Sequence, residues 1–314
     1  MAGNAGFNSF VGIGAESTWG TAVTRTKFYR LKSSTLRRKV TKVKRDTLYE
    51  GTGLVSRRSF VAQDDVEGTV VILATYEDIG LILHHAMWSS STTGPSGADY
   101  THTYILGASA PTGGLTIEIA QGGGSAIVYE GCRITKLKLS VEAGGLCMLE
   151  MEVIGQTSGA PTSASSPTFG TNEVEIEHHH ASQITWNSTA YDLRSWTLEL
   201  DNKLVRRQVL GTKLTADPKP SGLRDVSISI ASDYESDNWQ NGLTAHTSAS
   251  AVIAATASAR SITATMHNAY IDSDEIGVDT HGILPESIKL IGQSDATNRG
   301  LALVVVNTQS SATA

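Results

Sequence analysis

Apolar and polar residues alternate most regularly between Cys132 and Gln156, on both sides of a glycine pair. Alternation with period two predicts two half-buried antiparallel strands joined by a tight turn. With Ala143-Gly144-Gly145 as the loop, residues of like polarity face each other in four pairs: Leu139 and Leu149, Leu137 and Met151, Lys138 and Glu150, Lys136 and Glu152. A one-residue slip would set leucine against glutamate, so the pattern fixes the register. The apolar face must cover a core, and the charged face meets water, a partner or a lumen.

Other stretches predict further strands and one helix. Strands are expected at residues 28–36, 66–75 and 115–119. Residues 76–88 carry a helical stripe at three- and four-residue steps, formed by Ile79, Ile82, Leu83 and Ala86. Threonine, serine, glycine and valine are plentiful and helical periodicity is rare, so the predicted fold class is all-β with a minor helix.

Two stretches lack a core pattern. Residues 1–26 show little periodicity and are interpreted as an arm; their Gly12-x-Gly14 lacks the third glycine and the following helix of a dinucleotide site. Residues 157–171 are small, polar and proline-bearing, which is typical of a linker.

A basic segment follows the first predicted strand. It could form one charged face of an extended strand or a long loop. Val40 and Val43 are out of strand phase, which favours an exposed or subunit-contacting loop over residues 37–63, and a loop this long in a compact domain is usually functional, disordered or held by a neighbour. Nucleic-acid binding is the alternative, but the net charge of −6 argues against a protein that mainly holds phosphates. The candidate inter-subunit residues are Arg37, Arg38, Lys39, Lys42, Lys44, Arg45, Tyr49, Arg57 and Arg58.

The second half repeats the first in places. Residues 31–36 match residues 193–198, and the match continues to Leu48 and Leu210 at a constant offset of 162 positions. Asp65-Val66 and Asp225-Val226 each precede an apolar strand. The same order of elements predicts two tandem β-sandwich modules, residues 1–160 and 161–314, the second with its helix eroded around residues 234–243.

Few residues suggest chemistry. Cys132 and Cys147 are not opposite each other in the predicted hairpin, so free buried thiols are expected. Three successive histidines, 178–180, would alternate in a strand and cannot share one metal ion. The acidic stretch 272–281 could hold a cation through carboxylates but is more typical of a solvated loop. We therefore expect no enzyme activity, cofactor or metal, and no signal peptide or membrane span is predicted.

Four elements together resemble the tail tube proteins of long-tailed bacteriophages with non-contractile tails. They are the opening Gly14–Thr21, the strand Tyr29–Leu36, the helix Ile79–Trp88 after an apolar strand, and the hairpin Gly131–Gly155. The resemblance implies β-sandwiches flanked by a helix, with a long loop reaching adjacent subunits. It also implies six-unit rings stacked into a tube whose lumen tends to be negative. Because this chain carries two predicted modules, three chains would form a ring with pseudo-sixfold symmetry.

The implied partners are further copies of the chain, the tape measure, terminator and distal tail proteins, and DNA that passes without sequence-specific binding. The implied location is the virion tail, after synthesis in the host bacterial cytoplasm. A carbohydrate-binding or adhesive β-sandwich stays the alternative, although aromatic residues, which form sugar platforms, are only 6% of the chain.

Overall fold

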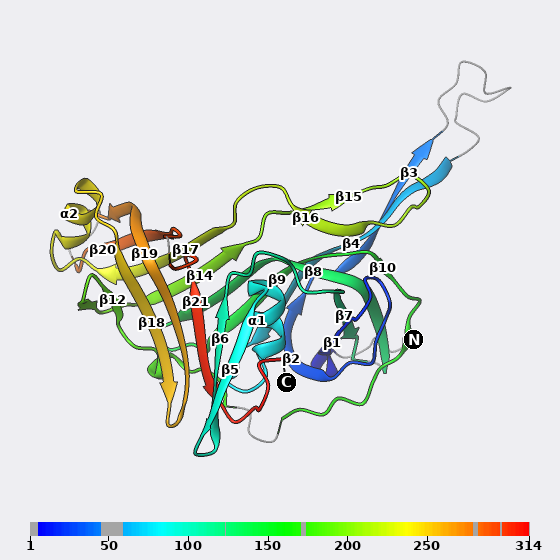
Figure 1. Cartoon of the computed structure of the whole chain (residues 1–314), viewed down its shortest axis with the longest axis horizontal. Helices are drawn as coiled ribbons and strands as arrows, with labels where there is room; N and C mark the ends of the chain where they lie inside the picture. The colour runs from blue at the N-terminus through cyan, green and yellow to red at the C-terminus, as the bar shows by residue number, and fades with distance from the viewer. Residues whose placement is uncertain are drawn as a thin grey trace.

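The computed structural model describes residues 6–44, 59–122, 124–170, 174–278, 282–295 and 297–313 (Figure 1). This part of the chain is nearly all β, with two short α-helices, and confirms the predicted fold class. The elements of the first half are η1 (Gly6–Asn8), β1 (Phe10–Ala15), β2 (Lys27–Ser34), β3 (Arg37–Lys44), β4 (Ser59–Leu73), α1 (Gly80–Met87), β5 (Ser90–Ser96), β6 (Asp99–Ile105), β7 (Leu115–Ala120), β8 (Ser125–Glu142), β9 (Met148–Gly155), β10 (Thr157–Ser158) and β11 (Thr162–Ser163). Those of the second half are η2 (His178–His180), β12 (Ile184–Trp186), β13 (Thr189–Tyr191), β14 (Ser195–Asp201), β15 (Leu204–Arg207), β16 (Ala216–Pro220), β17 (Asp225–Asp233), α2 (Asn238–Thr244), β18 (Ala249–Ala257), β19 (Arg260–Ile276), β20 (Pro285–Gly292) and β21 (Ala302–Asn307).

The hairpin predicted from the alternating pattern is formed by β8 and β9. All four predicted cross-strand pairs are present in the predicted register. The four apolar members, Leu137, Leu139, Leu149 and Met151, are at most 2% exposed. Cys132 and Cys147 are both free and buried, as expected. Polarity matching across the strands was therefore sufficient to fix this register.

One sheet runs through both halves of the chain. Its strands pair in the order β2/β3, β4, β9, β8, β14, β17, β20 and β19, with β2 and β3 lying end to end along β4. The two halves are joined where β14 pairs with the end of β8. One face of this sheet is apolar and covers a core shared by both halves, in which α1 is buried on seven of its eight residues. The other face is polar.

Both halves pair their strands in the same order. In the first half the order is β1, β7, β8, β9, β4, β2, and in the second it is β12, β18, β19, β20, β17, β14. The helices α1 and α2 follow equivalent strands, β4 and β17.

Two irregularities recur at equivalent positions. The β8–β9 register shifts between Ile134 and Lys136, and the β19–β20 register shifts between Ile271 and Ser273. Each of the two residues in β19 lies 137 positions after its counterpart in β8. The β7–β8 and β18–β19 pairings also shift at matching places. Bulges are specific local features, so their coincidence indicates that the halves are structurally equivalent. The module boundary near residue 160 stays a prediction.

Several predicted loops are regular structure. The expected arm at residues 1–26 contains β1, a buried strand whose alternation is broken because Gly12 and Gly14 lie against Phe28 and the Thr24 carbonyl. The expected loop at 37–63 is wrong where it is described, because β3 pairs with the start of β4. The predicted linker at 157–171 contains β10 and β11, which pair with β8.

Two further expectations need correction. The second-half helix is not eroded: α2 occupies residues 238–244 and buries Trp239, which stacks on Trp186 at 5.1 Å between ring centroids. The first-half helix begins at Gly80 instead of residue 76, since the acidic residues before it form buried ion pairs: Glu77 with Arg260 and Asp78 with Lys27. Those pairs tie the turn before α1 to β19 and β2.

Candidate assembly interface

The polar face of the long sheet carries rows of charged side chains of both signs. Its central part holds Lys136 and Lys138 on β8, between Glu150 and Glu152 on β9 and Glu199 and Asp201 on β14. The Lys136 ammonium lies 3.6 Å from Asp201 and 3.7 Å from Glu199. The ion pairs of Lys136 therefore reach toward β14, across the joint between the two halves.

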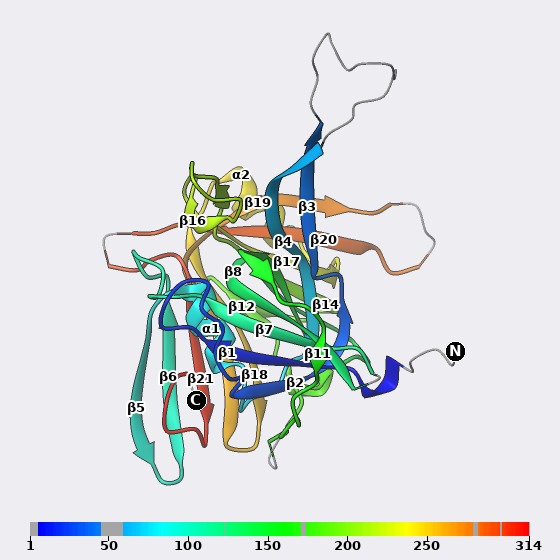
Figure 2. The ribbon, with the colours of Figure 1, turned by 90° about the vertical axis from the view of Figure 1, so that its right-hand side faces the viewer.

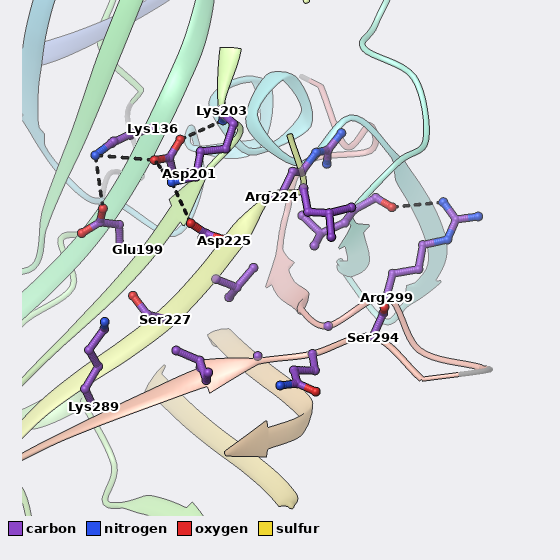
Figure 3. Close-up of a pocket in the computed structure, with 17 residues that line it drawn as sticks. Lys136, Glu199, Asp201, Lys203, Arg224, Asp225, Ser227, Lys289, Ser294 and Arg299 are labelled. Carbon is purple, nitrogen blue, oxygen red and sulfur yellow. Dashed lines mark hydrogen bonds and ion pairs between the residues drawn. The ribbon is translucent and has the colours of Figure 1, made fainter. Parts of the chain in front are cut away.

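A groove of about 910 Å³ opens at one end of this face (Figure 3). Lys203 bridges Asp201 at 3.0 Å and Asp225 at 2.7 Å across its wall. Partial burial opposes the effect, but hydrogen bonds from Lys203 hold the pKa of the Asp201 carboxyl below its ordinary value. The carboxylates of this wall are thus paired with lysines and are not poised as proton acceptors.

Arg224 lines the same groove. Its guanidinium stacks on Trp88 at 3.4 Å from the ring centroid and donates to the Gly107 carbonyl at 2.8 Å. Burial lowers the pKa of Arg224 to about 10, which leaves the guanidinium charged at neutral pH. Trp88 ends α1 in the left-handed conformation, so this cation–π contact fixes the helix end against the groove.

The strands β3 and β4 form an arm that projects away from the body (Figures 1 and 2). Every residue of β3 is exposed. On its surface Val40, Val43 and Phe60 are 39%, 43% and 56% exposed. A two-stranded ribbon with apolar residues on its outside is marginally stable in water by itself. Such a ribbon is suited to packing against another molecule.

Ion pairs and a second ribbon brace the base of the arm. Arg38 forms a bidentate pair with Asp64, and Glu67 receives Lys39 at 3.0 Å and Arg206 at 2.7 Å. Hydrogen bonds from Arg206 and Lys39 lower the pKa of Glu67. The β15–β16 ribbon, which carries Arg206, lies alongside in Figure 1 and bonds to the arm where the Asp64 amide donates to the Lys213 carbonyl at 2.9 Å.

The candidate residues fall into two groups. Arg37, Arg38, Lys39, Lys42 and Lys44 all lie on β3, whereas Arg45, Tyr49, Arg57 and Arg58 lie outside the described residues. Contact with another chain stays a prediction for all of them. Sequence reasoning missed Asp64 and Glu67, the partners on β4, because their signal appears only once β3 and β4 are paired.

The histidine run 178–180 and the acidic stretch 272–281 differ in structure from what the sequence predicted. His178–His180 form a 3-10 turn instead of a strand, in which His178 and His179 are exposed and His180 is half-buried. Asp272, Asp274 and Glu275 lie in β19 and not in the expected loop, while Asp279 and His281 lie outside the described residues. Within the described residues no group of three acidic, histidine or cysteine side chains could hold a metal ion, and no helix is long and apolar enough to span a membrane.

Comparison with known proteins gives one result that covers most of the chain. A family model described as phage tail tube protein matches residues 6–296. No curated protein matches the sequence.

Proposed function

The chain belongs to the phage tail tube protein family, and from that premise we propose that it polymerises into stacked rings whose lumen conducts DNA during ejection. The family makes it a structural component of the virion tail, which assembles with itself and with other tail proteins. The observation that carries the proposal is the long sheet, which has one polar face and, at each end, a stretch of strand edge that pairs with no further strand among the described residues.

A ring of three chains gives a tube of suitable width. Each chain contributes eight strands to the sheet, so three chains contribute 24. At about 4.8 Å per strand and a tilt of about 40°, a closed barrel of 24 strands is about 45–50 Å across its backbone. Side chains of about 5 Å on each wall leave on the order of 35–40 Å. A DNA duplex has grooves about 8.5 Å deep on either side of its axis, so its diameter is on the order of 20 Å. The duplex therefore fits in the lumen with room for water.

The polar face suits the lumen of such a tube. Charged residues of both signs alternate along it, and most of the lysines already bind carboxylates. Phosphate contacts by free lysines and arginines would hold DNA in place. A lumen whose cations are occupied lets DNA slide, which is what a conduit requires.

The arm supports the stacking of rings. It projects from one end of the sheet and is braced by ion pairs at its base. We propose that its exposed apolar residues pack on the adjacent ring.

The alternative, a carbohydrate-binding or adhesive β-sandwich, has less support. Of the five tryptophans, Trp88, Trp186, Trp196 and Trp239 are at most 7% exposed and are unable to form a sugar platform.

Negative-stain electron microscopy of the purified full chain tests the proposal. Rings or hollow tubes are the expected result. A dispersed monomer at all concentrations tried, with glycan binding on an array, would favour the adhesive alternative instead.

A further inference from the structure

The long sheet ends in two open backbone edges. One is the end of β19 beyond Ile271, which pairs with β20 on one side and with no described strand on the other. The second edge is formed by residues 33–39, from the end of β2 into β3, which pair with β4 while β1 covers only residues 27–30. No described strand covers this edge, although the Leu36 carbonyl accepts from the Tyr129 hydroxyl at 2.8 Å and the Leu36 amide donates to Ser34 Oγ at 3.2 Å. Unpaired strand edges are templates for an added strand. The two edges lie at opposite ends of the sheet (Figure 1).

The chain already contains this joint in closed form. Residues 136–142 of β8 pair with residues 195–201 of β14, from Lys136–Asp201 to Glu142–Ser195. Adding 137 positions converts β8 into β19, because their registers and bulges coincide. Subtracting 162 positions converts residues 195–201 into residues 33–39, as Ser33 faces Val71 on β4 and Ser195 faces Ala231 on β17. One open edge, on β19, is therefore equivalent to β8, and the other, at residues 33–39, is equivalent to β14. Within the chain β8 and β14 pair with each other, but their two equivalents do not.

We propose that residues 273–276 of β19 in one chain receive residues 36–39 of a second copy as an antiparallel strand, in the register of the β8–β14 joint. This inference rests on the proposed ring and names the contact that closes it. The two offsets place Arg37 opposite Glu275, Leu36 opposite Ile276 and Arg38 opposite Asp274.

The side chains at these positions are complementary. Inside the chain, basic residues on β8 face acidic residues on β14, as in the 3.6 Å approach of Lys136 and Asp201. At the open joint the order is reversed, because the basic residues lie on β3 and the acidic residues on β19. Leu36 and Ile276 take the places of the buried pair Leu198 and Leu139.

Two buried carboxyl oxygens, Asp274 Oδ1 on β19 and Glu286 Oε1 on the neighbouring β20, lie at this edge. Among the described residues neither oxygen has a partner other than the carboxyl group of the other residue, and Glu286 is 2% exposed. Ser232 donates to the other Glu286 oxygen at a long 3.3 Å. A guanidinium has five N–H donors, and Arg38 uses two of them on Asp64. The arriving Arg38 therefore brings free donors to the position opposite Asp274.

A designed disulfide tests the register directly. The Ala143 amide donates to the Arg194 carbonyl and the Asn202 amide to the Thr135 carbonyl, which makes Lys138–Glu199 a non-hydrogen-bonded pair. The equivalent pair, Arg37 and Glu275, then has Cα atoms about 4.5 Å apart, within reach of a disulfide. The double variant R37C/E275C should give covalent trimers on a non-reducing gel. The matched control K39C/E275C is displaced by two residues, about 7–8 Å away, and should not.

Charge reversal gives an independent readout. R37E and E275R should each raise the concentration for half-assembly roughly tenfold or more, because like charges then face each other. The double variant R37E/E275R should restore assembly. The control K32E changes an exposed charge on the preceding strand, β2, outside the proposed ladder, and should assemble normally.

The outcomes separate the inference from the proposed function. Crosslinking of K39C/E275C instead of R37C/E275C would overturn the register. Wild-type rings with no crosslink in either variant and no effect of charge reversal would overturn this joint while leaving the ring proposal standing. A wild-type chain that never forms rings would overturn the proposed function itself.

Discussion

The closed joint at β8–β14 and the open edge of β19 are built on the same backbone with different side chains. The closed joint buries Leu137 and Leu149, whereas the equivalent positions at the open edge, 137 residues later, carry Asp274 and Glu286. Inward-facing charges on an edge strand discourage indiscriminate strand addition. Within one chain the joint can therefore be apolar, whereas at the open edge the proposed joint would use charges that a second copy of the chain satisfies.

The largest effect is expected from removing the arm. The β15–β16 ribbon of the second half lies beside the arm but does not project as far from the body (Figure 1). Deleting residues 42–56 should leave a folded subunit with no tubes, because it shortens the arm and removes the exposed Val43, while none of the described buried core residues lies in the deleted segment. Circular dichroism checks the fold and electron microscopy checks the tubes. Normal tubes from the deletion variant would refute a stacking role for the arm.

The next effect separates the closed joint from the open edge. L139A should lower the free energy of unfolding by about 2–5 kcal/mol, since it empties a buried site between β9 and β14. I276A, at the equivalent position of the open edge, should cost the isolated subunit less than about 1 kcal/mol because Ile276 is only half-buried there. Urea denaturation of the two variants measures both values. Equal losses would show that the two positions are not equivalent.

A smaller effect concerns the buried carboxyl at the open edge. Burial, the Asp274 carboxylate and the more distant Glu235 raise the pKa of Glu286 to about 7, while the Ser232 hydrogen bond opposes the shift. A group with a raised folded-state pKa stabilises the fold below its unfolded pKa of about 4.5, and this contribution is lost as the pH rises to about 7. The slope is at most about 1.4 kcal/mol per pH unit.

E286Q should therefore flatten the decline in Tm of the isolated subunit between pH 5 and pH 7, with E142Q as the control because Glu142 is exposed and does not act on Glu286. Thermal melts at several pH values provide the measurement. An unchanged slope in E286Q would contradict the assignment of this titration to Glu286.

The smallest effect lies on the polar face of the closed joint. Lys136 is 43% exposed and its nearest carboxylate oxygens are 3.6 Å and 3.7 Å away. K136Q should change the free energy of unfolding by less than about 1 kcal/mol. A loss above about 2 kcal/mol in urea denaturation would mean that the polar face, and not the apolar one, holds the joint together.

Sequence patterns predicted the elements that have one solvent-exposed face and one buried face. The β8–β9 register followed from alternating leucines, lysines and glutamates. The strand β1 was missed because glycines replace side chains where its neighbours come close. The strand β3 was missed because all of its residues are exposed, so no alternation marks it. The helix α2 was missed because it is held mainly by one aromatic residue, Trp239.

The open edge could not be found from sequence. Its acidic residues were interpreted as a solvated loop, because carboxylates in a short stretch usually are solvated. Their meaning depends on the pairing of β19 with β20 and on the equivalence of β19 with β8, which lies 137 residues earlier. Only the repeated offset of 162 positions between residues 31–48 and 193–210 was visible beforehand, and it supplies the other side of the proposed joint.

The central claim is that one chain supplies two equivalent modules to a ring. Electron cryomicroscopy of tubes assembled from the full-length chain, with native mass spectrometry of single rings, tests it most directly. We expect rings of three chains, about 100 kDa from a chain of 33.3 kDa, with threefold symmetry that approaches sixfold at low resolution. Rings containing six copies of the chain, or an inner wall made by only one half of each chain, would contradict it.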